Sequence, residues 1–173
     1  MREVDLIVIG AGPAGMAAGA EASAAGLSVT VLDEQPGPGG QIYRAVTGAG
    51  GARGAVLGRD YLDGAALAQA MQASGVRHLT GAVVWNVEPD VDGITVTFSQ
   101  DGRAAQLRAA RLLLATGALE RPVPVPGWTL PGVMTAGAGQ ILLKASGLVA
   151  ERAVLAGSGP LLYLLAAQMA RAG

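Results

Sequence analysis

Short apolar runs separated by glycine-rich turns and by stretches of helical spacing make up the hydrophobic pattern of this chain. The first run, residues 4–9, is typical of a strand buried on both faces of a parallel sheet. Residues 13–25 are expected to form a helix, whose first turn tolerates Pro13 because a missing N–H costs nothing there. A second buried strand is expected over 27–32, just before Asp33. Strand, helix and strand in this order predict an α/β fold with a parallel sheet.

The turn between the first strand and the helix carries a dinucleotide-binding fingerprint, Gly10-Ala11-Gly12-Pro13-Ala14-Gly15. Its first glycine allows a tight turn, its second lets the backbone approach a pyrophosphate, and its third permits close packing of helix on strand. The phosphates would lie on the free N–H groups at the positive end of the helix. The fingerprint therefore predicts a Rossmann-like nucleotide-binding domain.

Asp33 follows the glycines by about 20 residues, where the ribose of a dinucleotide needs a hydrogen-bond acceptor. A carboxylate at this place would repel a 2′-phosphate, so it favours the unphosphorylated ribose of FAD or NAD. The loop 35–41 that comes next cannot continue a helix. Its Gly39 and Gly40 would let backbone amides approach the ligand, and the position directly after the acid favours this role over a plain surface turn.

The middle of the chain predicts supporting structure. Residues 45–58 are expected to form a mobile loop, and 59–74 a packing helix with one apolar face. Three short runs then predict a small β-meander inserted before the parallel sheet resumes, at 81–87, 94–98 and 105–107. The sheet resumes at 111–115 and leads into Thr116-Gly117, which would again bring the backbone close to the nucleotide.

A second glycine motif, Gly157-Ser158-Gly159-Pro160, follows a short apolar run at 153–156 that is expected to be a strand. Leu162 stands where the first motif has Gly15, so the helix cannot approach its strand in the same way. NAD(P) binding at this second motif is therefore unsupported.

Composition fits a cytoplasmic α/β protein whose core is built from Ala, Val and Leu, because 51% of the residues are hydrophobic and only 3% aromatic. The net charge of -1 gives no electrostatic basis for nucleic-acid binding. Neither a transmembrane span nor a signal peptide is indicated. The absence of cysteine excludes dithiol redox chemistry and cysteine-bound iron–sulfur clusters or zinc within these residues.

No catalytic residue or metal site is indicated by the sequence. His78 is expected to be an ordinary solvated or packed histidine, and Trp128 a packing anchor. Arg44 and Arg121 have about even odds of binding an anion or being solvated. The stretch 137–140 mimics a nucleotide motif, but its helical continuation argues against a phosphate site.

The chain resembles the FAD/NAD(P)-binding oxidoreductase subunits of the opine oxidase, hydrogen cyanide synthase and hydroxyproline dehydrogenase group, which are similar to the nucleotide-binding region of the sarcosine oxidase α subunit. The segments that carry this resemblance are 10–15, 31–36 with 39–44, 115–122 and 126–133. The last two are far more specific than the glycine fingerprint.

The resemblance implies a two-dinucleotide-binding flavoprotein with FAD in the first site. It places near FAD the residues Gly10, Ala11, Gly12, Pro13, Ala14, Gly15, Asp33, Glu34, Gln35, Gly40, Gln41, Val84, Ala115, Thr116 and Gly117. It also implies oxidation of a C–N bond in an amino acid, opine or other secondary amine, by a complex with other subunits.

In the resembled architecture the chain later returns to complete the FAD domain, so this sequence is expected to be an N-terminal piece that is inactive alone. The expected division is the first part of an FAD-binding domain at 1–122, a connecting segment at 123–150 and the start of an NAD(P)-binding-like domain at 151–173. Two other functions are considered: an electron-transferring, NAD(P)H-dependent flavin reductase, and a truncated nucleotide-binding module without catalysis.

Overall fold

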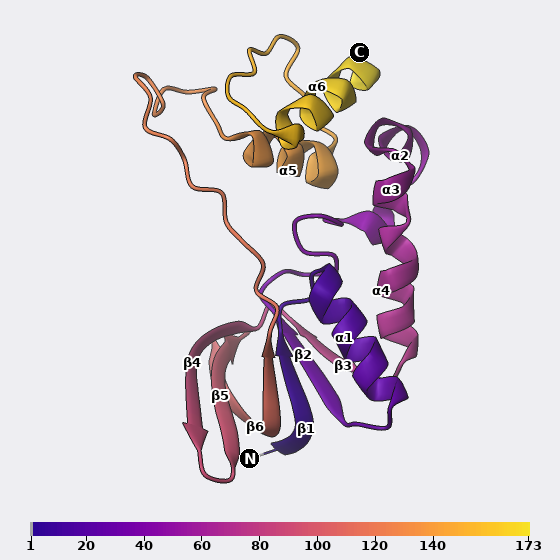
Figure 1. Cartoon of the computed structure of the whole chain (residues 1–173), viewed down its shortest axis with the longest axis vertical. Coiled ribbons are helices and arrows are strands. Elements are labelled where there is room, and N and C mark those ends of the chain that lie inside the picture. The colour runs from indigo at the N-terminus through magenta and orange to yellow at the C-terminus, as the bar shows by residue number, and fades with distance from the viewer. Residues whose placement is uncertain (1) are drawn as a thin grey trace. The chain divides into compact units, whose positions relative to one another are not determined.

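A computed structural model describes residues 2–173 of the chain (Figure 1). It divides into two compact units: residues up to 47 together with 63–117, and residues 48–62 together with 118–173. The first unit contains β1 (Arg2–Ile9), α1 (Pro13–Ala24), β2 (Val29–Asp33), α4 (Gly64–Ala73), β3 (Arg77–Thr80), β4 (Val83–Asp90), β5 (Gly93–Gln100) and β6 (Arg103–Leu114). The second contains α2 (Gly51–Leu57), α3 (Arg59–Leu62), α5 (Ala136–Ser146) and α6 (Pro160–Ala172), and a short 3-10 turn, Val46–Gly48, lies at the first boundary.

One six-stranded sheet organises the first unit, in the order β3-β2-β1-β6-β5-β4. The strands β3, β2, β1 and β6 are parallel, whereas β5 and β4 continue the sheet in antiparallel pairing. Helices α1 and α4 pack against each other, and α1 also packs on β1 and β2 (Figure 1). The predicted α/β fold, with a parallel sheet and an inserted meander, is confirmed.

β6 belongs to both parts of this sheet. Its first half pairs with β5 and its second half with β1, and residues 107–109 pair with both. The sequence analysis expected two strands here, one ending at 107 and one beginning at 111. That expectation is wrong, because no glycine or proline interrupts 103–114 and the side chains keep alternating: Leu107 and Ala109 are buried, and Arg108 between them is not.

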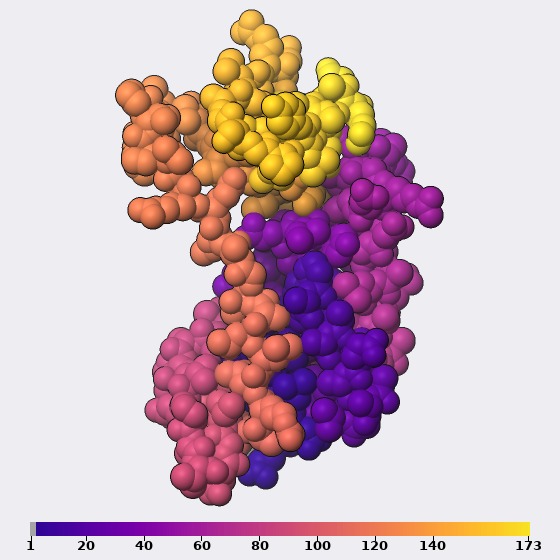
Figure 2. Space-filling view, in the orientation of Figure 1, coloured from indigo at the N-terminus to yellow at the C-terminus, as the bar shows by residue number. Residues whose placement is uncertain are grey.

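The core of the first unit lies between the parallel strands and the meander. Ile7 and Leu32 come from β1 and β2, and they meet buried residues of the meander and of the turn before it: Ala82, Val96, Phe98, Leu107 and Ala109. The meander consists of β4, β5 and the first half of β6, and the space-filling view shows β5 directly beside β6 (Figure 2). Phe98 is the one phenylalanine of the chain, so aliphatic side chains supply nearly all of this core.

Three other expectations are corrected, and one strand was missed. Residues 51–57 form α2 instead of a mobile loop, and Gly54 lies against Leu62, where an added Cβ would be 3.2 Å from the leucine side chain. The single helix expected over 59–74 is two helices, α3 and α4, because the helix is interrupted at Asp63, which is the N-cap of α4. β3 was not predicted at all. Residues 153–156 form no strand: Val154 is 95% exposed, and a strand needs a hydrogen-bonded neighbour.

The buried hydroxyl of Thr30 offers a test of this core. Thr30 is fully buried, and no described residue gives its Oγ1 a hydrogen-bond partner. Thr30→Val should therefore raise the free energy of unfolding by about 1 kcal/mol, since an unsatisfied polar group is removed at nearly constant shape. Thr97→Val is the matched control: Thr97 is also buried, but its Oγ1 accepts a hydrogen bond from Gln106 Nε2 at 3.2 Å. In urea unfolding, Thr97→Val should lower the free energy of unfolding by about 1 kcal/mol, because its hydrogen bond is lost. A change of the same sign for both substitutions would contradict the assignment.

Candidate functional site

The glycine turn after β1 is held by close backbone contacts. Gly10 has a φ of +103°, and its N–H donates to the carbonyl of Leu32 at 2.8 Å. A Cβ at this position would collide with the carbonyl oxygen of Ala115, whose own N–H donates to Ile9 at 2.8 Å. The start of the Ala115-Thr116-Gly117 segment therefore lies directly beside the first glycine, and only glycine fits there.

The other two glycines of the fingerprint differ in what surrounds them. At Gly15 a Cβ would collide with the carbonyl oxygen of Gly10, so this glycine brings α1 close to its strand. At Gly12 a Cβ would lie 3.9 Å from its nearest neighbour, the Cα of Gly40, which is an ordinary contact. Gly12 is the N-cap of α1, and no side chain caps the free N–H groups of the first helical turn.

The Asp33 carboxylate is bonded to the glycine turn. It is 7% exposed, and its Oδ2 accepts a hydrogen bond from the backbone N–H of Ala11. Its Oδ1 accepts from the N–H of Gln35 at 2.7 Å. A carboxylate has about four lone-pair sites, so two remain for further donors such as ribose hydroxyls.

A second loop, residues 35–44, also contacts the glycine turn. The N–H of Gly39 donates to the carbonyl of Ala11 at 2.8 Å. Gly40 has a φ of +59°, and a Cβ there would lie 2.8 Å from the Cα of Gly12. The close approach of the two loops therefore requires glycine at position 40.

The structure thus brings together most of the residues that the sequence analysis placed at the first site, from Gly10–Gly15, Asp33 and Gln35 to Gly40 and Ala115. Glu34 and Gln41 are exposed, and the Glu34 carboxylate accepts from Gln35 Nε2 at 3.1 Å. Val84 differs, because its side chain packs against the core and it pairs with Phe98 in the meander. A ligand contact at Val84 would have to come from the backbone.

Sequence reasoning missed the anchor of the second loop. The ring of Tyr43 lies against Gly64 at the start of α4, where a Cβ would collide with it. No local pattern links these two positions, because their approach depends on tertiary structure. Arg44 was considered as an anion ligand, and in the structure its Nη1 donates to Gln35 Oε1 at 2.8 Å.

The remaining candidates have other environments. His78 lies on β3, where burial lowers its pKa below the usual value while the charge of Asp33 acts in the opposite direction. Arg121 is exposed, and Trp128 is 44% exposed. The stretch 137–140 lies inside α5, whose first turn is bonded by the Thr135 hydroxyl and, at Gly137, by the Glu120 carboxylate at 2.8 Å.

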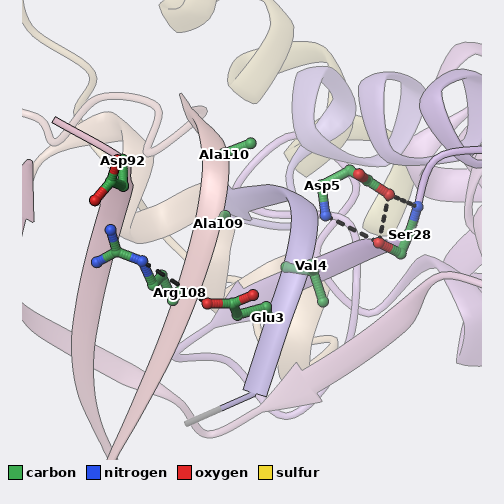
Figure 3. A pocket seen from close by; sticks show the side chains of 8 residues that line it. All are labelled: Glu3, Val4, Asp5, Ser28, Asp92, Arg108, Ala109 and Ala110. Carbon is green, nitrogen blue, oxygen red and sulfur yellow. Dashed lines mark hydrogen bonds and ion pairs between the residues drawn. The ribbon is translucent and has the colours of Figure 1, made fainter. Parts of the chain in front are cut away.

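A polar pocket of about 290 Å³ lies near the start of β1, away from the glycine turn at its end (Figure 3). Asp5 and Ser28 bond each other there, the N–H of each residue donating to the side chain of the other at 2.9 and 2.8 Å. The Ser28 hydroxyl also donates to Asp5 Oδ2 at 2.5 Å, and this bond, together with the one from the Ser28 N–H, lowers the pKa of Asp5. Arg108 binds both oxygens of Asp90 at 2.6 Å. Because Asp5 is already bonded to Ser28 and Arg108 to Asp90, we do not assign a ligand to this pocket.

The Arg108–Asp90 pair predicts a titration result. Hydrogen bonds from Arg108 lower the pKa of Asp90 to about 2 from its usual 3.8. Since the folded-state pKa is depressed, the stabilisation is present above pH 3.8 and is lost as the pH falls through about 2. Arg108→Gln should return the Asp90 midpoint toward 3.8 in an NMR titration, whereas Arg103→Gln should leave it near 2. An unchanged midpoint in Arg108→Gln would show that other groups set it.

Two further properties concern the described residues as a whole. No group of three or more His, Asp or Glu side chains among residues 2–173 is arranged to hold a metal ion. No helix in this range combines the length and the apolar character needed to cross a membrane.

Residues 4–173, which include the glycine turn, its helix and its acid, match the pyridine nucleotide-disulphide oxidoreductase family. The chain belongs to this family. The family's name refers to disulphides, but the chain has no cysteine, so no dithiol pair lies within these residues.

Curated relatives confirm the resemblance found from the sequence. An opine oxidase subunit of Agrobacterium tumefaciens (strain Ach5) is 54% identical over 98% of this chain and 35% of its own length. The HcnB subunit of hydrogen cyanide synthase from Pseudomonas aeruginosa is 37% identical over 96% of this chain and 36% of its own length. The sarcosine oxidase α subunit of Corynebacterium sp. (strain P-1) is 34% identical over 98% of this chain and 18% of its own length. The chain spans about a third, or less, of these relatives.

Solved structures agree on the fold. L-proline dehydrogenase from P. horikoshii aligns with a TM-score of 0.68 at 19% identity, covering 85% of this chain and 29% of that one. Thioredoxin reductase from Streptococcus pyogenes aligns with a TM-score of 0.51 at 26% identity, covering 71% of this chain and 38% of that one.

Proposed function

We propose that the chain binds FAD at its glycine turn, as part of an oxidoreductase subunit that oxidises a C–N bond of an amino acid, an opine or another secondary amine. The observation that carries the proposal is the arrangement around α1. The N-cap of the helix is a glycine without a capping side chain, Asp33 bonds the turn at Ala11, and a Cβ at Gly12 would make only an ordinary contact with Gly40. The similarity to opine oxidase and sarcosine oxidase subunits supports the reaction class.

The residues present fit the adenosine half of such a cofactor. The first turn of α1 offers N–H donors to a pyrophosphate, and the free lone pairs of Asp33 offer acceptors to a ribose. When bound, FAD would supply the redox chemistry by accepting two electrons, as a hydride equivalent from the C–H group beside the nitrogen, as C–N is oxidised to C=N and the N–H proton is released. This chain binds and orients the nucleotide, and we assign no catalytic residue within it.

We also propose that the chain works with other subunits in the cytoplasm, and that residues 1–173 alone bind FAD poorly and oxidise no amine. Three of the proteins it resembles are named as subunits, of opine oxidase, hydrogen cyanide synthase and sarcosine oxidase. The chain covers only 35%, 36% and 18% of those proteins, which supports a need for more protein around the flavin.

A second candidate function is electron transfer from NAD(P)H through the flavin, and one observation favours it. α6 begins at Gly159 with Pro160 in its first turn and no capping side chain, as α1 begins at Gly12 with Pro13. Leu162 in place of a third glycine weighs against it. Failure to turn over any amine, with retained NAD(P)H oxidation, would favour this reductase. Nucleotide binding with neither activity would favour a non-catalytic module.

The test of FAD binding uses the whole encoded protein, purified with its partner subunits. We expect a yellow protein that releases FAD on denaturation, and dye-linked oxidation of proline, hydroxyproline or opines. Asp33→Ala should weaken FAD binding by about 1–3 kcal/mol, because hydrogen bonds to a charged acceptor are lost. Glu88→Ala is the control, since this exposed carboxylate lies on β4, outside the glycine turn and its loops. A protein that stays colourless after reconstitution with FAD would refute the proposal.

A further inference from the structure

Gln35 is a branch point of hydrogen bonds between the two loops of the site. Its N–H donates to Asp33 Oδ1 at 2.7 Å, and its backbone carbonyl accepts from the N–H of Gly81 at 3.3 Å. Its side-chain oxygen accepts from Arg44 Nη1 at 2.8 Å. A guanidinium only donates, so the amide oxygen, and not the amide nitrogen, must face Arg44. The orientation of Gln35 is therefore fixed by chemistry.

Arg44 stands at the far end of the second loop, whose near end is bonded to the glycine turn. The N–H of Tyr43 donates to the carbonyl of Gly39 at 3.0 Å, which makes one tight turn of these residues. The N–H of Gly39 donates in turn to Ala11 at 2.8 Å. A displacement of Arg44 would thus be transmitted along this turn to Gly39 and Gly40.

These bonds form a closed ring. Ala11 donates to Asp33, Gln35 donates to the other oxygen of Asp33, and Arg44 donates to Gln35. The turn from Tyr43 to Gly39 then leads back to the carbonyl of Ala11. Every member is partly or fully shielded from solvent, which strengthens such bonds and makes the loss of one member affect the others.

We propose that Gln35 and Arg44 are positioning residues of the nucleotide site. They act through Asp33 and the second loop, holding the acid and the glycines ready for the adenosine half of the ligand, and their contribution appears as affinity. The inference rests on the nucleotide binding proposed above. It assigns to Arg44 a role other than direct contact with a phosphate or a substrate carboxylate.

The test measures ADP binding by calorimetry in the whole protein with its partner subunits, because ADP contains the adenosine and the diphosphate without the flavin. Arg44→Ala and Gln35→Ala should each weaken ADP binding about tenfold, the loss expected for one charge-assisted hydrogen bond. The double variant should be no weaker than either single variant, since both break the same ring. Arg44→Lys should keep affinity within about threefold of the parent, because an ammonium can still donate to Gln35.

A second readout does not depend on the ligand. In the unliganded protein, the amide protons of Ala11 and Gln35 should exchange with solvent faster in Arg44→Ala than in the parent, since their acceptor Asp33 is less well held. Arg103→Ala is the matched control, because it removes one positive charge from an exposed side chain of the same unit. It should change neither ADP affinity nor amide exchange.

ADP affinity of Arg44→Ala within twofold of the parent, with unchanged amide exchange, would overturn the inference. So would a double variant about a hundredfold weaker, which would mean that the two residues act independently. If Arg44→Ala fails to fold, Gln35→Ala decides by the same criteria. A parent protein that binds neither ADP nor FAD refutes the proposed function and the inference with it, whereas nucleotide binding unaffected by these substitutions refutes the inference alone.

Discussion

Gly12→Val is expected to leave the fold intact and to weaken FAD binding at least about 100-fold, or roughly 3 kcal/mol. Gly12 has φ −72° and ψ −177°, a backbone conformation that any residue can adopt. The protein itself has room for a Cβ, which would lie 3.9 Å from Gly40. The valine methyl groups would instead occupy the space above the first turn of α1, where the pyrophosphate is proposed to lie.

The measurement is FAD titration of the whole protein beside thermal unfolding without ligand. Val caps a helix less well than Gly, so a loss of up to about 1 kcal/mol in stability is expected. Gly37→Ala is the control from the neighbouring loop, because a Cβ there meets nothing within 4 Å. Equal FAD affinity of Gly12→Val and the parent would show that the phosphates do not approach the backbone at Gly12.

Gly15→Ala should have the largest effect on stability, a loss of about 3 kcal/mol or more. The position is helical, so alanine by itself would favour the helix by about 1 kcal/mol. The new methyl group would collide with the carbonyl oxygen of Gly10, which is backbone of the tightest part of the turn and cannot move without displacing Ala115. Packing, and not helix propensity, should decide the outcome.

Gly19→Ala in the same helix separates the effect of packing from the effect of helix propensity. Its Cβ would lie 3.2 Å from a methyl group of Val31 and 3.7 Å from one of Val76, and side chains can shift where a backbone carbonyl cannot. We expect its free energy of unfolding to stay within about 1 kcal/mol of the parent, because the gain in propensity offsets the tighter contact. Similar losses for both substitutions in chemical denaturation would mean that the Gly10 contact is not special.

The sequence predicts the parts of the fold whose signal is local. β1, α1 and β2 follow from two apolar runs around a glycine turn, and the meander follows from alternating residues between Asp-Gly turns. β3 escapes because it has only four residues and includes an arginine and a histidine, so that pairing with β2 is what makes it a strand. The break between α3 and α4 escapes because helical spacing continues across it.

The candidate site also has parts with a local sequence signal and parts that depend on tertiary structure. Gly10, Gly12, Gly15 and Asp33 can be placed from spacing alone. The bond from the N–H of Gln35 to Asp33 is local, as is common for an aspartate in a turn. The sequence does not reveal that the Asp33 carboxylate bonds the N–H of Ala11, because these residues are 22 positions apart and meet only in the folded sheet. For the same reason the Tyr43–Gly64 contact has no counterpart in any sequence pattern.

Because β6 pairs with both β1 and β5, it limits the order in which the protein can fold on the ribosome. β1 is the first strand to be synthesised, yet one of its two neighbours is β6, and their register pairs Glu3 with Arg108 and Ile9 with Leu114. On the order of 100 residues must therefore leave the ribosome before β1 can be completed, and such distant pairings form slowly. Until then one edge of β1 stays open to other partners. If β4, β5 and β6 pair first, β6 meets β1 already paired on its other side. The meander comes later in the chain, but we expect it to fold before β6 pairs with β1 and closes the parallel sheet.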